Sequence, residues 1–156
     1  MSSEELLNRL TREGKLKRQR TDTAYLNNLI EAAKRNFEAA SLVKGKVDEA
    51  AFKLFYDGLL QIGRVILLLN GYLPDNGEQH KTTFSVAGEF LGSEFSSLII
   101  KIQKFRIKRN DCIYEPMGLI SKSETDAIYK TPQEFWHKVT EYLRKMNPQL
   151  ELFKKF

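Results

Sequence analysis

The chain has 156 residues, of which 42% are hydrophobic and 29% charged, and its formal net charge is +5 at pH 7. This length fits one domain with its own core, and the composition is that of an ordinary soluble globular protein. The single cysteine, Cys112, excludes an intramolecular disulfide framework, and the longest apolar run, residues 65–69, is far too short to span a bilayer. The charged N-terminal segment lacks the apolar region of a signal peptide. We therefore expect a cytoplasmic protein whose basic character permits nucleic-acid binding without establishing it.

The first predicted element is a short amphipathic helix over residues 3–12. Its apolar side is formed by Leu6, Leu7 and Leu10. The basic segment GKLKRQRTD, residues 14–22, follows as a linker. Thr21 or Asp22 can cap the next helix, which we expect to continue to about Val43 because apolar residues recur every three or four positions. Those positions are Leu26, Leu29, Ile30, Ala33, Phe37 and Ala40.

A third helix is predicted from Asp48 to Asn70, and its apolar stripe is the widest in the chain. The stripe consists of Phe52, Phe55, Leu59, Ile62, Ile66 and Leu69, and it is widened by Val65, Leu67 and Leu68. A helix of this kind is buried on several sides, so we expect it at the centre of the fold. A loop of turn-forming residues follows over 72–77.

The second half of the chain is also predicted to be helical. One stretch runs from about His80 to Arg109, with Gly88 and Gly92 as candidate breaks. We expect a loop around Glu115–Gly118 and then a short turn capped by Ser123. The last helix is predicted to begin at the sequence TPQE, with Thr131 as N-cap, Pro132 at the first helical position and Glu134 at the third. Asn147 and Pro148 end it.

No strand pattern competes with these helices, so the predicted fold class is all-α: an up-and-down helical bundle of four to five main helices. The whole chain, residues 1–156, is expected to be one domain. Within it, residues 1–20 form an N-terminal helix and basic arm, and residues 21–147 form the bundle core.

The segment FRIKRNDCIYEP, residues 105–116, contains the candidate site. The helix that leads into it has an apolar stripe of Phe95, Leu98, Ile99 and Ile102, which Arg106, Arg109 and Ile113 continue. Lys101, Lys104 and Lys108 fall on the opposite face, which we interpret as solvated. Because a charge removed from water needs a partner, Arg106 and Arg109 are expected to pair with an acid inside the bundle, line a cleft or lie at a subunit interface. An internal ion pair and a phosphate site both remain open, since a guanidinium can bind phosphate through two hydrogen bonds.

His80 and Lys81 stand near the predicted start of a helix. Either His80 packs and hydrogen bonds there, or the two residues contact a phosphate or nucleotide at the helix N-terminus. Cys112 is expected to be a small, partly buried residue, and His137 to have a surface or packing role. Two histidines and one cysteine, far apart in sequence, give no metal-ligand cluster, so we predict neither metal nor cofactor.

The motif RNDCIY, residues 109–114, resembles the RN-xxx-Y version of the HEPN signature. The segments LLNRLTREGKLKRQ, LIEAAKRNFEAA and FKLFYDGLLQIGRVILLLNGYLPDNGEQHKTT resemble the same subgroup in the same order, over about residues 5–145. The resemblance implies an all-α bundle that forms a homodimer. It also implies an RNA- or nucleotide-binding function, a toxin-like, metal-independent endoribonuclease activity, or pairing with a small nucleotidyltransferase that acts as antitoxin.

Carried over to this chain, the resemblance assigns catalytic positions to Arg109, Asn110 and Tyr114. Arg109 would neutralise the phosphate and Asn110 would orient the 2′-hydroxyl. Tyr114 stands where family members that cleave RNA have a histidine, and a phenol with a reference pKa near 10 is a poor base. Arg106, together with His80 and Lys81, would bind RNA or nucleotide. The alternative function is a non-catalytic, dimeric interaction module that partners a small nucleotidyltransferase.

Overall fold

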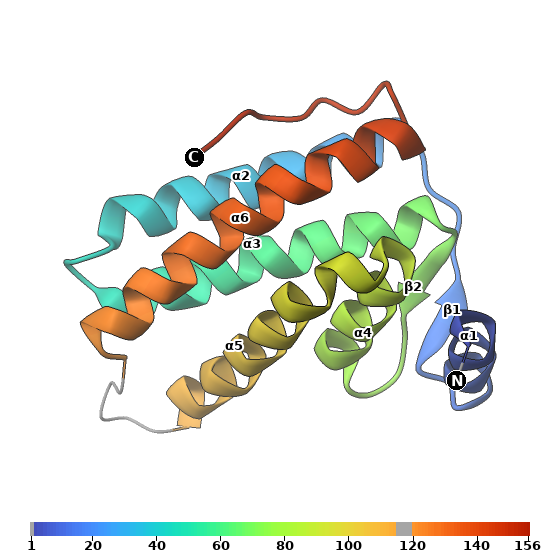
Figure 1. Ribbon diagram of the computed structural model, residues 1–156, viewed down its shortest axis with the longest axis horizontal. Coiled ribbons are helices and arrows are strands. Elements are labelled where there is room, and N and C mark those ends of the chain that lie inside the picture. Colours follow the sequence, from blue (N-terminus) through green and yellow to red (C-terminus); the bar gives the residue numbers. More distant parts are fainter. Residues whose placement is uncertain (1, 115–119) are drawn as a thin grey trace.

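The computed structural model describes residues 2–114 and 120–156 (Figure 1). The described residues form six α-helices, one short 3-10 helix and a two-stranded ribbon, so the predicted all-α bundle is confirmed. The elements are α1 (Ser3–Arg12), β1 (Leu16–Arg18), α2 (Thr23–Val43), α3 (Asp48–Leu69), β2 (Tyr72–Pro74), α4 (Gln79–Leu91), η1 (Ser93–Phe95), α5 (Ser96–Tyr114) and α6 (Lys122–Met146).

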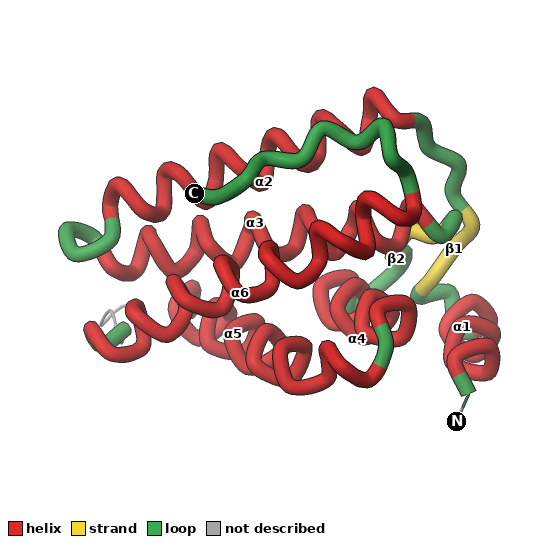
Figure 2. Tube along the Cα trace, turned by 45° about the horizontal axis from the view of Figure 1, so that its top comes forward, coloured by secondary structure: helices red, strands yellow, loops and turns green. Residues whose placement is uncertain are grey.

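Helix α3 is the centre of the bundle, as its wide apolar stripe predicts. It packs against α2, α4, α5 and α6, and α2 and α6 run along it for most of its length (Figures 1 and 2). Its stripe residues from Phe52 to Leu68 are almost entirely buried. Helix α2 begins where predicted, because the Asp22 side chain accepts a hydrogen bond from the backbone N–H of Tyr25.

The α2–α3 contact depends on Gly58. A Cβ atom at this position would overlap the ring of Phe37, with Cδ1 only 2.7 Å away, and Phe37 is completely buried. We expect Gly58→Ala to lower the free energy of unfolding by about 1–3 kcal/mol, because this overlap outweighs the gain in helix propensity of about 1 kcal/mol.

Gly88→Ala on α4 is the matched control for this prediction. Its Cβ would meet Ile99 at 3.3 Å, which a small shift accommodates, so its unfolding midpoint should stay near that of the parent. Equal urea unfolding midpoints for the two variants would show that α2 and α3 do not meet at Gly58.

The predicted linker over residues 14–22 is wrong in part, because residues 16–18 form strand β1. This strand pairs antiparallel with β2, with Leu16 opposite Pro74 and Arg18 opposite Tyr72. Leu16 is buried, and the guanidinium of Arg18 lies 4.5 Å from the centroid of the Tyr72 ring. Three-residue strands are too short to show an alternating pattern, which is why the sequence did not reveal them.

The predicted start of the last helix at Thr131 is also wrong. Helix α6 begins ten residues earlier, with Ser121 as N-cap and Lys122 as first helical residue, and Ser121 and Glu124 form a reciprocal capping box. Ser123, predicted to cap a separate turn, lies inside the helix. Pro132 occupies the helix interior, where it removes one backbone donor but packs its ring in the core. The predicted end at Asn147 is confirmed.

Of the two candidate breaks between α4 and α5, the structure uses Gly92. Its φ of +99° is a conformation that favours glycine, whereas Gly88 continues α4. The predicted loop around Glu115–Gly118 lies outside the described residues. None of the helices in the described part of the chain combines the length and the apolar character needed to cross a membrane.

Residues 148–156 follow α6 as an extended segment that lies along α2 and α6 (Figure 2). Phe153 stacks on Trp136 of α6, with ring centroids 3.9 Å apart, and Phe156 stacks on Phe37 of α2 at 4.3 Å. The indole N–H of Trp136 donates to the Phe153 carbonyl at 2.9 Å. This segment therefore closes the side of the core between α2 and α6.

Candidate functional site

Three helices bring the candidate site together. Helix α3 supplies Tyr56 and Asp57, the first turn of α4 supplies His80, and α5 supplies Arg106 and Arg109. Both α4 and α5 pack on α3 and on each other, so residues distant in sequence become neighbours. We call these five residues the α3–α4–α5 cluster.

Arg109 is largely buried, with 22% of its side chain exposed. Its Nη2 lies 3.4 Å from Oδ1 of Asp57, and its Cζ lies 5.4 Å from the centroid of the Tyr56 ring. The expected internal acidic partner is therefore present. The Nε of Arg109 is nevertheless buried and has no hydrogen-bond partner among the described residues. An unpaired buried donor is costly, so the protein's own groups leave the hydrogen bonding of this guanidinium incomplete.

Asp57 is the one carboxylate of α3 after its first turn, within the fully described range Asp48–Leu69. Burial raises the pKa of its carboxyl group, and the positive charge of Arg109 acts in the opposite direction. With 39% of the side chain exposed, a ligand can still reach it. Asp57 thus neutralises part of the charge of Arg109 while leaving an acceptor open to solvent.

His80 contacts the buried Tyr56, which confirms the expected packing and hydrogen bonding near a helix start. Its Nδ1 lies 3.2 Å from the Tyr56 hydroxyl oxygen, and the two ring centroids are 5.7 Å apart. Burial lowers the pKa of His80, and the neighbouring positive charge of Arg109 adds to the effect. Burial raises the pKa of the Tyr56 phenol, so both groups are neutral near pH 7.

Arg106 is partly buried and is linked to α4 through Gln103. The Nε of Arg106 donates to Oε1 of Gln103 at 2.7 Å. The Gln103 amide in turn donates to the Lys81 backbone carbonyl at 3.2 Å and to the Ser85 hydroxyl at 3.3 Å. Arg106 is therefore held in place, whereas the ammonium of Lys81 is exposed and lies 3.9 Å from Glu78.

The other two predicted catalytic residues are Asn110 and Tyr114. Asn110 is exposed and makes no side-chain hydrogen bond within the described residues, and the side chain of Tyr114 lies outside them. The structure thus brings together three of the six predicted residues: Arg106, Arg109 and His80. Tyr56 and Asp57 were not predicted from the sequence. The one signal that could have indicated the site was Asp57 itself, an isolated carboxylate within a long apolar helix.

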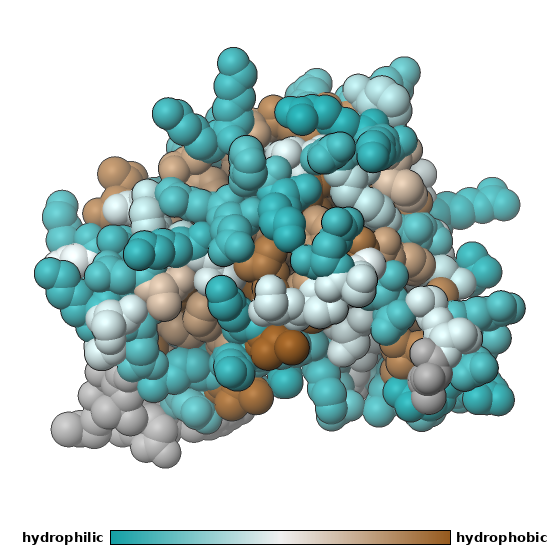
Figure 3. Space-filling view, viewed as in Figure 1, coloured by the Kyte–Doolittle hydropathy of each residue, from teal (hydrophilic) through white to brown (hydrophobic). Residues whose placement is uncertain are grey.

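The predicted solvated lysine face is correct in two positions and wrong in the third. Lys101 and Lys104 are exposed, but the ammonium of Lys108 lies 3.3 Å from the Glu124 carboxylate and is only 29% exposed, because α6 begins earlier than predicted. Cys112 is buried more fully than the expected partial burial, and His137 is exposed, as expected for a surface role. Figure 3 shows hydrophilic side chains over most of one face of the molecule, with apolar side chains in separate patches.

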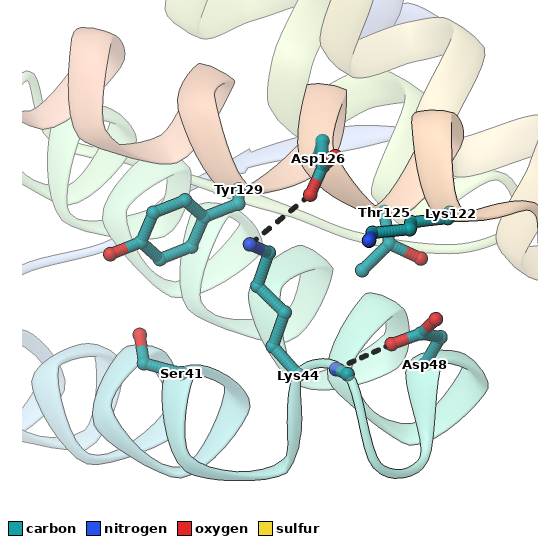
Figure 4. A pocket seen from close by; sticks show the side chains of 8 residues that line it. Ser41, Lys44, Asp48, Lys122, Thr125, Asp126 and Tyr129 are labelled. Carbon is teal, nitrogen blue, oxygen red and sulfur yellow. Dashed lines mark hydrogen bonds and ion pairs between the residues drawn. The ribbon is translucent and has the colours of Figure 1, made fainter.

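A polar pocket of about 400 Å³ lies where the end of α2 meets the first turns of α3 and α6 (Figure 4). Lys44 points across it, with its ammonium 3.2 Å from Asp126 and 4.6 Å from the centroid of the Tyr129 ring. Asp48 accepts a hydrogen bond from the backbone N–H of Gly45. The charged side chains of Lys44, Asp48 and Asp126 in this pocket therefore already have partners. None of the predicted site residues lines the pocket.

The described residues contain no group of three or more His, Cys, Asp or Glu side chains placed to hold a metal ion. The α3–α4–α5 cluster itself contains two guanidinium groups, one carboxylate, one imidazole and one phenol. No protein-family model matches the chain, and neither a curated protein nor a solved structure matches it.

Proposed function

We propose that the protein is HEPN-like and binds RNA or a nucleotide through a phosphate group at the α3–α4–α5 cluster. The observation that carries this proposal is the position of Arg109, whose side chain is 22% exposed and whose one ion-pair partner among the described residues is Asp57, 3.4 Å away. A phosphate oxygen is the acceptor that suits this side chain, because a guanidinium can present two parallel N–H groups to two oxygens of one phosphate.

The charge of the cluster supports an anionic ligand. Arg106 and Arg109 contribute two positive charges and Asp57 one negative charge, while His80 is neutral near pH 7 because its pKa is lowered. The cluster is therefore net positive after its internal ion pair is counted. The open carboxylate oxygen of Asp57 can accept a hydrogen bond from a ribose hydroxyl, which inorganic anions lack. Asn110, exposed next to Arg109 in the chain, can add a second contact of this type.

The start of α4 offers a further phosphate contact. Glu78, the residue before the helix, has a φ of 48° and provides no side-chain cap, so the first backbone N–H groups of α4 have no side-chain acceptor. Backbone N–H groups at a helix N-terminus, together with the helix dipole, favour phosphate. Since His80 belongs to this first turn, one ligand can contact both the helix start and the arginines.

The proposal is tested by titrating the protein with a short RNA that lacks terminal phosphates, in a metal-free buffer of low ionic strength. The corresponding nucleosides, which carry no phosphate, are the matched ligands. We expect the RNA to bind and the nucleosides not to bind, and the RNA affinity should fall steeply as salt is added. Equal binding of nucleosides and RNA, or no binding of either, would contradict the proposed function.

A further inference from the structure

The hydroxyl of Tyr56 is the only group that hydrogen bonds the imidazole ring of His80 within the described residues. Tyr56 is completely buried in the core, and its oxygen lies 3.2 Å from Nδ1 of His80. No second partner of this hydroxyl is present in the described part of the chain. The direction of this one hydrogen bond therefore determines which nitrogen of His80 carries the proton.

The buried phenol must act as the donor. If Nδ1–H of His80 donated instead, the Tyr56 proton would lie in the core without an acceptor among the described residues, which costs about 1–3 kcal/mol. Burial raises the pKa of the phenol, so Tyr56 keeps its proton. With Nδ1 accepting, the neutral imidazole carries its hydrogen on Nε2.

The charges around His80 keep the imidazole neutral. Burial lowers its pKa most, and Arg109 and Arg106 on α5 and Arg64 on α3 lower it further. Asp57 on α3 acts in the opposite direction but is itself paired with Arg109. A neutral imidazole with hydrogen on Nε2 is a hydrogen-bond donor at that atom.

We propose that Tyr56 is a positioning residue that fixes His80 as a neutral Nε2–H donor to a phosphate oxygen of the ligand. This inference rests on the proposed function and adds the role of His80: it holds the phosphate and transfers no proton. Cleavage of RNA through its 2′-hydroxyl requires a group that removes the hydroxyl proton. In this arrangement both nitrogens of His80 are occupied, one by its own hydrogen and one by the Tyr56 hydroxyl.

The first test is the tautomer of His80 in the ligand-free protein, measured by ¹⁵N–¹H correlation through the ring protons. The expected spectrum has a protonated Nε2 and an unprotonated Nδ1. A protonated Nδ1 would overturn the inference, and this result does not depend on any ligand. Neither tautomer would contradict the proposed function, because RNA binding through Arg109 does not require a particular tautomer of His80.

The second test compares replacements of His80 in the RNA titration described above. In His80→Gln the side-chain amide N–H can take the place of Nε2–H, so affinity should change by less than about twofold. In His80→Ala this donor is lost, and affinity should fall about fivefold. If the parent cleaves the RNA and His80→Gln abolishes that cleavage, the imidazole transfers protons and the inference is wrong.

The third test is Tyr56→Phe, which removes one oxygen and keeps the ring. Without the donated hydrogen bond nothing holds Nδ1 of His80 as an acceptor, so the ¹⁵N–¹H correlation of this variant should show both neutral tautomers of His80. The parent should show the Nε2–H tautomer alone. Identical tautomer spectra for the two proteins would overturn the role of Tyr56. Failure of the parent to bind RNA would overturn the proposed function and, with it, this inference.

Discussion

An Arg109→Ala variant is expected to bind short RNA at least about tenfold more weakly than the parent at low salt. Two hydrogen bonds from the guanidinium to a phosphate would be lost, and each charge-assisted bond contributes about 1.5–3 kcal/mol, so losses of a hundredfold are within range. Fluorescence anisotropy with a labelled RNA in metal-free buffer measures the effect. Arg109→Lys should recover part of the affinity, because it restores the charge but not the planar pair of donors.

Lys101→Ala is the matched control, because it removes one positive charge from an exposed position of the same helix. Its effect on RNA binding should be small, since an exposed charge contributes only through the long-range field. Equal losses for Lys101→Ala and Arg109→Ala would mean that RNA senses only the net charge of α5. Loss of Arg109 also leaves the partly buried carboxylate of Asp57 unpaired, so binding should be compared after far-ultraviolet circular dichroism has verified the fold.

Trp136→Ala is expected to cause the largest loss of stability, about 3–5 kcal/mol in the free energy of unfolding. Trp136 is 2% exposed, stacks face to face with Phe153 and donates its indole N–H to the Phe153 carbonyl. The substitution therefore opens a cavity in the core and releases the extended segment over residues 148–156. Urea unfolding must be followed by circular dichroism, because Trp136 is the single tryptophan of the chain.

Two further variants separate the effect of the lost ring from the effect of the lost indole hydrogen bond. Trp136→Phe keeps an aromatic ring but removes the N–H donor, and should cost roughly 1–3 kcal/mol for the unpaired carbonyl and the smaller ring. His137→Ala, at the next residue and exposed, should stay within about 0.5 kcal/mol of the parent. A Trp136→Ala variant as stable as His137→Ala would show that residues 148–156 do not pack on α6.

The helices that were predicted well are those whose ends and apolar faces are determined locally. The cap at Asp22 and the regular apolar spacing of α2 and α3 depend on neighbouring residues only, and the structure follows them. The start of α6 was missed because the chain contains two cap-like sequences, and tertiary packing of Pro132 allows the helix to begin at the earlier one. The β1–β2 ribbon was missed because its pairing joins residues more than fifty positions apart.

Only those residues of the candidate site could be predicted whose burial follows from the apolar pattern of a single helix. Arg106 and Arg109 were identified because the apolar stripe of α5 continues into them, so their burial could be expected from the spacing. The partners of these arginines come from other helices: Asp57 from α3 directly and Lys81 of α4 through Gln103. Tyr56 gave no signal, since a tyrosine within an apolar stripe resembles any other core residue until the position of α4 is known.

The β1–β2 ribbon changes how the basic arm would contribute to binding an anion. Beyond the strand pairs, the backbone N–H groups of Gln19, Asp75 and Asn76 bond to carbonyls across the ribbon, so residues 14–19 are held against the segment that leads into α4. A disordered arm would lose about 1–2 kcal/mol of backbone conformational entropy for every residue that becomes ordered on binding. Here folding has already ordered the backbone of the arm, so Lys17 and Arg18 would meet a polyanion with little further backbone entropy to lose.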